Sequence, residues 1–398
     1  MDAEQARMVF SLVWQSPSAT HRDRTFFPKI NFWRDLLPGQ MDRHLDRFVK
    51  AGQYSESFEA GTLVAPFDPK KVIRCPLNRI HGKQKDTSQR IFSRGRFYPR
   101  GLLSGIGFSP QDTRPFRVQS SNDAELLVDT NHPLAPYPLI VAAELVETLN
   151  QRHQRGGSSL DIGQSVADNG PGLQGVQPES PPDFLSGDPF DRLDPEADTL
   201  FYQHPRLVNH IDQEASRQIA AIYGRLLKPG MTVLDLMAAW NSHLNPDNGR
   251  MSVTGLGLNR VEQEENPNLS DIVCQDLNRN PQLPFGSETF DACICTVSVE
   301  YLIDPVPVFE AVGRILKKGA PFVITFSDRW FDTKVIRLWT ELHPFERMAL
   351  VVTYFMDSGM FDGLQTESIR GYPRSREDKY YPERQESDPV FAVWGFRK

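Results

Sequence analysis

The chain has 398 residues, of which 39% are hydrophobic and 10% aromatic, enough apolar material for more than one globular core. Its 51 acidic and 44 basic side chains give a formal charge of −7, so the charge balance does not indicate a nucleic acid as the partner. No stretch approaches the ~18 apolar residues that a membrane-spanning helix needs, and no signal peptide is visible. We therefore expect a cytoplasmic protein of two domains with no membrane span.

The four cysteines do not form a metal-binding pattern, because the sequence has no CxxC pair. Cys293 and Cys295 alternate along one predicted strand, so both point to the same face and cannot easily form a disulfide with each other. We expect structural thiols in a reducing compartment and no metal site.

The first 150 residues combine short predicted strands with one short helix. The helix is expected over residues 41–50, where apolar side chains recur at helical spacing, and Gly52 ends it. The predicted strands cover residues 9–14, 62–65, 72–77, 116–119, 124–128 and 139–149. This pattern indicates a small α+β domain over residues 1–150.

Three motifs in this half carry a resemblance to a known family. They are residues 36–41 (LLPGQM), residues 67–72 (FDPKKV) and, most specifically, residues 128–135 (VDTNHPLA). With them, the chain from about residue 8 to 148 resembles, in patches, the SlyD-like branch of the FKBP-type peptidyl-prolyl isomerases. The resemblance implies an FKBP-like domain in which an aromatic cradle binds a proline ring and favours the twisted amide.

The pocket that this resemblance implies departs from the family at two positions. Gln40 stands where the family has a large apolar residue, and Val141 stands where the last strand usually offers phenylalanine. The candidate peptide-binding residues are Phe32, Leu36, Leu37, Phe67 and Val141. They are equally well explained as core residues of a fold that has lost isomerase activity. Binding of a proline-containing or unfolded polypeptide survives that loss more readily, because it needs only an apolar groove.

Residues 151–186 differ sharply from what precedes them. They are rich in Gly, Ser, Gln and Pro and show no sustained hydrophobic period. We interpret them as a flexible linker between the two domains.

The remaining residues, 187–398, alternate predicted strands with helices. They are organised around residues 232–244 (TVLDLMAAWNSHL), a short buried strand that runs into a turn. A helix is expected before it, over residues 207–227. Further strands are expected over residues 251–257, 271–274, 292–297, 321–326, 361–370 and 390–396, and further helices over 306–316, 333–342 and 344–356. This order predicts an α/β Rossmann-like domain with a mainly parallel sheet that binds its ligand at the carboxyl ends of the strands.

Four stretches of this half resemble the class I, type 11 group of S-adenosylmethionine-dependent methyltransferases. They are residues 233–236 (VLDL), 275–277 (QDL), 283–291 (LPFGSETFD) and 308–319 (VFEAVGRILKKG), within a resemblance that covers about residues 200–396. It implies S-adenosylmethionine as the cofactor and methyl transfer to a small-molecule or peptide acceptor.

The resemblance also implies which residues surround the cofactor. The family's glycine-rich turn is replaced by Met237, Ala238, Ala239 and Trp240, and Asn259 stands where a carboxylate should hold the ribose. The implied cofactor-binding residues are Asp235, Met237, Ala238, Ala239, Trp240, Gly257, Asn259, Asp276, Leu277 and Thr296. Glu262 is placed to reach back toward the ribose position from the next turn.

Two interpretations of this half remain open. In one it is a working methyltransferase with a variant turn, in which Trp240 offers an aromatic face to the cationic sulfur. The catalytic candidates are then His243, Glu300 and Tyr301, although capping, surface exposure and core packing explain each equally well. In the other, the half is an inactive scaffold and the whole chain is a folding helper, either an isomerase or a holdase chaperone.

Overall fold

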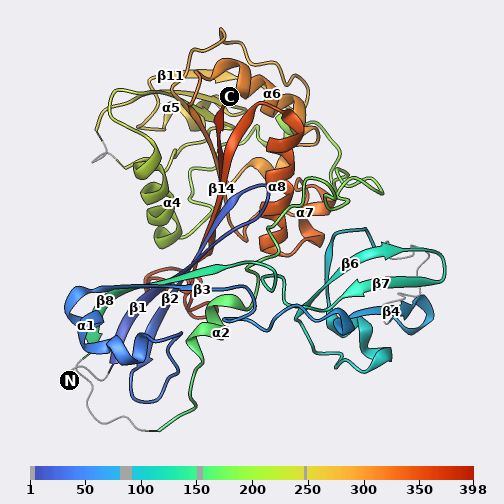
Figure 1. Ribbon diagram of the computed structural model, residues 1–398. Helices are drawn as coiled ribbons and strands as arrows, with labels where there is room; N and C mark the ends of the chain where they lie inside the picture. Colours follow the sequence, from blue (N-terminus) through green and yellow to red (C-terminus); the bar gives the residue numbers. More distant parts are fainter. Residues whose placement is uncertain (1–4, 81–91, 150–155, 246–248) are drawn as a thin grey trace. The chain divides into compact units, whose positions relative to one another are not determined.

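The computed structural model describes residues 5–80, 92–149, 156–245 and 249–398, which divide into two compact units (Figure 1). The first unit runs to Pro189 and includes residues 345–350. The second unit comprises residues 190–344 and 351–398. Within the described ranges, no helix is both long and apolar enough to cross a membrane.

The first unit contains a four-stranded antiparallel arrangement in the order β2-β1-β8-β3. Its strands are β1 (Gln5–Gln15), β2 (Thr20–Asn31), β3 (Gln53–Phe58) and β8 (Leu139–Leu149). Alternate side chains of β1, among them Met8, Phe10 and Leu12, are fully buried, which is the pattern of a strand with one face on a core.

A short helix packs on this core, as its spacing predicted. The 3-10 turn η1 (Met41–His44) leads into α1 (Leu45–Ala51). Met41 of η1 and Phe48 of α1 are buried. Gly52 ends α1 with a left-handed φ of 73°, and its N–H donates to the Phe48 carbonyl at 2.7 Å. The predicted strand over residues 62–65 is wrong: this segment is a turn, in which the Thr62 hydroxyl donates to the Glu59 carbonyl at 2.6 Å.

A second, smaller sheet is inserted between β3 and β8, in the order β4-β7-β6-β5. It comprises β4 (Val72–Pro76), β5 (Phe97–Pro99), β6 (Pro115–Ser121) and β7 (Glu125–Asp129), with the short 3-10 turns η2 (Pro69–Lys71), η3 (Leu77–Arg79) and η4 (Arg100–Ile106). β6 and β7 contain the strands expected over residues 116–119 and 124–128, and they pair antiparallel with each other. Asn131 ties the two ends of the insertion together: its Oδ1 accepts from the Asp68 N–H at 2.9 Å, and its Nδ2 donates to the Asp68 carbonyl at 3.0 Å.

The segment predicted as a linker contains packed structure. Its residues 151–155 lie outside the described ranges, but α2 (Ile162–Ala167) follows and is capped by the Asp161 carboxylate. Ile162 and Val166 are buried in the first unit's core, so the apolar side chains of this segment have fixed positions.

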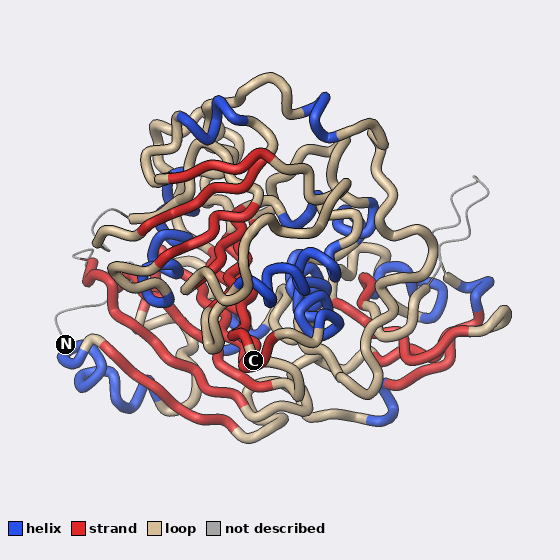
Figure 2. The backbone as a smooth tube through the Cα atoms, turned by 90° about the horizontal axis from the view of Figure 1, so that it is seen from above, coloured by secondary structure: helices blue, strands red, loops and turns tan. Residues whose placement is uncertain are grey.

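The second unit contains one mixed sheet, in the order β11-β10-β9-β12-β13-β15-β14. Its strands are β9 (Thr232–Leu236), β10 (Ser252–Gly257), β11 (Asp271–Cys274), β12 (Ala292–Thr296), β13 (Pro321–Phe326), β14 (Phe361–Arg370) and β15 (Val390–Arg397). The first five are parallel, but β15 runs antiparallel to both β13 and β14. The prediction of a mainly parallel sheet is therefore corrected to a mixed one. The strands expected over 361–370 and 390–396 are β14 and β15, which pair with each other, and β15, which leads to the C-terminus, lies inside the sheet (Figure 2).

Helices connect these strands, and the two expected from residues 207 and 333 begin later than predicted. They are α3 (Asp198–Phe201), α4 (Gln213–Leu226), α5 (Arg260–Glu264), α6 (Pro305–Ile315), α7 (Arg337–Glu341) and α8 (Pro344–Ser358), with the 3-10 turn η6 (Val299–Tyr301). The helix expected from residue 207 starts at 213, because Asp212 caps it by accepting from the Ala215 N–H at 2.8 Å. Asp212 is itself fixed by tertiary contacts, since its Oδ2 lies 3.2 Å from Arg374 and accepts from the Asp388 N–H at 2.7 Å.

Candidate functional site

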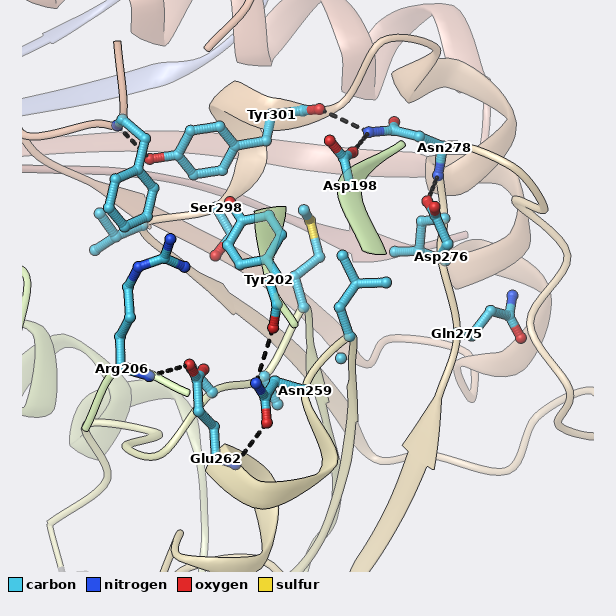
Figure 3. A pocket seen from close by; sticks show the side chains of 18 of the residues that line it. Asp198, Tyr202, Arg206, Asn259, Glu262, Gln275, Asp276, Asn278, Ser298 and Tyr301 are labelled. Carbon is cyan, nitrogen blue, oxygen red and sulfur yellow. Dashed lines mark hydrogen bonds between the residues drawn. The ribbon is translucent and has the colours of Figure 1, made fainter. Parts of the chain in front are cut away.

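A cleft opens at the carboxyl ends of β9, β10, β11 and β12 in the second unit (Figure 3). Its empty space, part of which is open to solvent, is about 780 Å³. The last residue of each strand, or the one just after it, lines the cleft: Met237, Gly257, Gln275 and Val297. Parallel strands leave their carboxyl ends at one edge, which is why ligands of open α/β sheets bind there.

The turn after β9 keeps a glycine-like conformation without a glycine. Met237 has a left-handed φ of 59°, a conformation that costs a residue with a side chain roughly 1–2 kcal/mol. The next N–H, of Ala238, donates to the Leu256 carbonyl at 2.8 Å. A Cβ on Gly257 would lie 2.1 Å from the Ala238 carbonyl oxygen, so this position admits no side chain. The glycine needed for the close approach of the two strands' ends is therefore Gly257.

The structure brings seven of the ten implied cofactor-binding residues to the cleft wall: Met237, Ala238, Ala239, Gly257, Asn259, Asp276 and Leu277. It places the other three, Asp235, Trp240 and Thr296, outside the lining. Trp240 does not fill the cleft, because its Nε1 donates to the Val208 carbonyl at 2.9 Å.

Asp235 lies beneath the turn rather than in the cleft. It is buried, its Oδ2 has no hydrogen-bond partner among the described residues, and Ser242 bonds its carboxyl. Burial raises the pKa of Asp235 to about 7, because desolvation penalises the ionised form. Asn266 donates to the Ser242 hydroxyl at 2.9 Å and to the Ala239 carbonyl at 2.9 Å, so the group holds the turn in place.

Thr296 is likewise turned inward. Its hydroxyl lies 2.6 Å from the Tyr223 hydroxyl, which also lies 3.0 Å from the hydroxyl of Thr325. The following residue, Val297, lines the cleft with a φ of 48°, and its N–H donates to the Thr325 carbonyl at 2.7 Å. A β-branched residue at positive φ is a strained conformation, and such strain concentrates at functional sites.

Asn259 and Glu262, both expected near the end of β10, lie together in the cleft wall. The Asn259 side chain accepts from the Glu262 N–H at 3.1 Å and donates to the Tyr202 carbonyl at 2.8 Å (Figure 3). Glu262 also lines the cleft, and its Oε1 accepts from the Arg206 N–H at 2.6 Å. Burial raises the pKa of Glu262, and the N–H and the charge of Arg206 act against this shift.

Asn278 joins the opposite wall of the cleft. Its N–H donates to Asp276 Oδ1 at 3.0 Å, and its Nδ2 donates to Asp198 Oδ2 at 2.8 Å and to the Tyr301 carbonyl at 2.9 Å. Asp276 is thereby held at the end of β11, where the sequence placed it.

The segment before α4 supplies one wall of the cleft and is fixed by buried charges. Asp198 lies 2.8 Å from Arg192 and 3.4 Å from Lys334, which is fully buried and also lies 2.9 Å from Asp194. Because removing one member of a buried ion pair leaves an uncompensated charge, this network holds the segment in place. Tyr202, Arg206 and His210 of the segment reach the cleft.

The three catalytic candidates have different positions. Tyr301 lines the cleft, and its hydroxyl accepts from the Phe331 N–H at 2.9 Å. Glu300 is fully buried and is not part of the lining. His243 is also outside the lining: its Nδ1 lies 2.7 Å from the Ser216 hydroxyl, and burial lowers its pKa to about 4.

Sequence reasoning missed several residues of the cleft wall. They are Asp198, Tyr202, Arg206, Gln275, Asn278 and Phe331. They come from the segment before α4 and from loops after β11 and β13, where no periodic pattern or spacing marks them.

The candidate peptide-binding residues of the first unit do not share one environment. Val141 is fully buried in the core, and Phe32 and Leu37 pack against that core. Leu36 is 59% exposed and Phe67 is 50% exposed. Three of the five are thus explained by core packing.

Comparison with known proteins points to the second unit. Residues 248–324 match the family described as a methyltransferase domain. This range includes β10, β11 and β12, and hence the strand ends that form most of the cleft. No curated protein sequence matches the chain.

Among solved structures, several chains are similar to about half of this one. A chain from the complex between the Trm112 methyltransferase activator of Haloferax volcanii and a methyltransferase has 17% identity and a TM-score of 0.36, covering 46% of this chain and 91% of that one. An S-adenosylmethionine-dependent methyltransferase from Mesorhizobium loti has 15% identity and a TM-score of 0.31, covering 46% and 98%. Geranyl diphosphate C-methyltransferase from Streptomyces coelicolor, solved with S-adenosyl-L-homocysteine, has 13% identity and a TM-score of 0.31, covering 47% and 81%.

We expect Gly257→Ala to destabilise the second unit by about 1–3 kcal/mol, because the added methyl would overlap the Ala238 carbonyl. Thermal unfolding of the full chain measures the effect. Gly286→Ala is the matched control, since its Cβ would meet nothing closer than the Thr289 hydroxyl at 3.4 Å. Equal melting temperatures for the two variants would contradict the close approach.

We expect Asp235→Asn to stabilise the fold increasingly as the pH rises. The pKa of about 7 in the folded chain exceeds the ordinary 3.8, so between these values the folded state keeps a proton that the unfolded state loses. The free energy of unfolding of the wild-type chain therefore falls by ~1.4 kcal/mol per pH unit in this range, and Asp235→Asn removes that fall. Denaturant unfolding from pH 4 to 8 should show a flatter profile for Asp235→Asn than for wild type. The control Asp271→Asn, at an exposed position, should show the same pH profile as wild type. If the profile of Asp235→Asn runs parallel to that of wild type, the raised pKa of Asp235 is refuted.

Proposed function

We propose that the second unit is an S-adenosylmethionine-dependent methyltransferase of the class I, type 11 group. The observation that carries the proposal is the cleft at the ends of four parallel strands, most of it inside the range that matches a methyltransferase domain. Trp240 lies outside the lining of this cleft and Met237 forms part of its wall, so the turn that lacks the family's glycines borders an open cleft.

The charges of the cleft suit this cofactor. S-adenosylmethionine carries a sulfonium and an ammonium against one carboxylate, and two carboxylates of the cleft, Glu262 and Asp276, can balance that excess. Glu262 would accept from the ribose hydroxyls, since both polar groups of the Asn259 side chain already make hydrogen bonds. Asp276 would accept from the adenine amino group at the end of β11. The close approach of Gly257 to Ala238 leaves the backbone of both turns at the ligand surface.

The cofactor supplies an electrophilic methyl group, and the chain's task is to hold and deprotonate the acceptor. Tyr301 stays protonated at neutral pH, because burial, followed by Glu300, raises its pKa well above the usual value. It therefore acts as a hydrogen-bonding group rather than a base. His210 also lines the cleft, and burial, aided by Arg206, lowers its pKa, so it is neutral near pH 7 and able to accept the acceptor's proton.

A second function, a holdase role for the first unit, is favoured by its exposed apolar side chains. Leu36 and Phe67, in the motifs on which the expected resemblance to FKBP-type isomerases rests, are about half exposed, whereas a buried Val141 cannot line a proline pocket. This role would engage unfolded polypeptides and is compatible with methyl transfer by the second unit.

We expect isothermal titration of the full chain with S-adenosyl-L-homocysteine to give a micromolar to millimolar dissociation constant. Glu262→Gln and Asp276→Asn should each weaken it by about tenfold, as each removes a charge-assisted hydrogen bond. The exposed Asp271→Asn should leave it unchanged. Absence of heat with the wild-type chain at millimolar ligand would end the methyltransferase proposal.

We expect the chain to suppress aggregation of a denatured client protein without accelerating proline isomerisation in a protease-coupled peptide assay. Phe67→Ser should weaken the suppression, because it removes an exposed ring, and Ile140→Ser at another exposed apolar position is the control. Acceleration of isomerisation by the wild-type chain would show that the proline pocket is intact.

A further inference from the structure

Arg206 presents a positive charge to the cleft that the described part of the chain does not satisfy. Its Nη2 donates to the Phe201 carbonyl at 3.2 Å, but its Nη1 is shielded from solvent and has no hydrogen-bond partner among the described residues. A guanidinium has five N–H donors and no acceptor, so a buried Nη1 without a partner is costly. An acceptor from a ligand would remove that cost.

Three aromatic rings fix the guanidinium in this position. Its central carbon lies 4.4 Å from the ring centroid of Phe201, 5.3 Å from that of Phe331 and 5.8 Å from that of Tyr202. Cation–π contacts of this kind orient the group and exclude water from its faces. They do not neutralise its charge, and they leave the edge of the guanidinium available for hydrogen bonds.

No carboxylate in the described ranges forms an ion pair with this guanidinium, taking 4.0 Å as the limit. Glu262 accepts from the main-chain N–H of Arg206, so it fixes the backbone without taking the side chain's donors. Asp198, the other carboxylate of this wall, is occupied by Arg192 and Asn278. Figure 3 shows Arg206 across the cleft from Asp276, at the opposite end from the proposed adenine position.

We propose that Arg206 and its aromatic neighbours form a carboxylate-binding subsite in the cleft. A carboxylate matches the planar fork of a guanidinium and can accept two parallel N–H bonds from it. The inference rests on the proposed methyltransferase function. Two reacting molecules can supply the group: the amino-acid end of S-adenosylmethionine and a methyl acceptor that is itself an acid.

Calorimetry with two nucleosides separates these sources. S-adenosyl-L-homocysteine carries the amino-acid carboxylate, whereas 5′-methylthioadenosine has the same thioether nucleoside without it. Both are titrated into the wild-type chain and into Arg206→Met, which keeps the length of the side chain and loses its charge. Benzoate, a carboxylate on an aromatic ring, is then titrated into each chain saturated with 5′-methylthioadenosine, which leaves the subsite open.

If the cofactor fills the subsite, Arg206→Met weakens S-adenosyl-L-homocysteine binding about tenfold or more and leaves 5′-methylthioadenosine unchanged. If the acceptor fills it, both nucleosides bind both chains equally, and Arg206→Met loses the binding of benzoate. Either result supports the subsite. The subsite is overturned if the wild-type chain and Arg206→Met bind all three compounds equally. It is also overturned if benzoate does not bind and Arg206→Met leaves the dissociation constants of both nucleosides unchanged.

Two variants guard against loss of folding as the explanation. Arg206→Lys keeps the charge without the fork and should retain part of the lost affinity, which a merely structural role would not predict. Arg217→Met removes an exposed arginine of α4 and should bind every compound as wild type does. If neither nucleoside binds the wild-type chain while benzoate binding still depends on Arg206, the methyltransferase proposal fails and the carboxylate subsite stands.

Discussion

The cleft of the second unit depends on the buried carboxylate of Asp198, where three distant segments meet. Arg192 and Lys334 neutralise it and Asn278 donates to it, so the segment before α4, the loop after β11 and the loop after β13 are tied together. A desolvated charge is tolerated only while its partners stay in place. The network therefore fixes residues 198–206 as a wall, and with them the position of Arg206.

The turn after β9 depends on a second constraint, the close approach of its backbone to the end of β10. A close approach between the ends of β9 and β10 requires one position without a side chain, and Gly257 provides it. Met237 then takes the left-handed conformation that a glycine would adopt at no cost. The turn thus keeps a left-handed backbone conformation without a glycine at Met237, with Asp235, Ser242 and Asn266 supporting it from below.

The distribution of charge around the cleft links this architecture to the proposed chemistry. Glu262 lies in α5, which follows β10, and Asp276 follows β11. Arg206, from the segment before α4, lies beside Glu262 and across the cleft from Asp276 (Figure 3). Opposite charges that are not paired with each other suit a ligand carrying both signs, because each can bind its counterpart without first breaking an internal ion pair. In the proposed function, Tyr301 and His210 orient the acceptor, and both are neutral near pH 7 because burial raises the pKa of Tyr301 and lowers that of His210.

The sequence by itself determined the order of the strands in the second unit and of its helices other than α3 and α5, because apolar runs bounded by turn residues record burial locally. Met237 and Asp276 line the cleft because they lie just after β9 and β11, whereas their contact with a cofactor stays a prediction. Only the tertiary structure decided that β15 pairs antiparallel within the sheet and that α4 begins after Asp212. It also decided that Glu262, Arg206 and Phe331 line one cleft. These features depend on contacts between residues far apart in the chain, and such contacts produce no hydrophobic period or motif spacing in the local sequence.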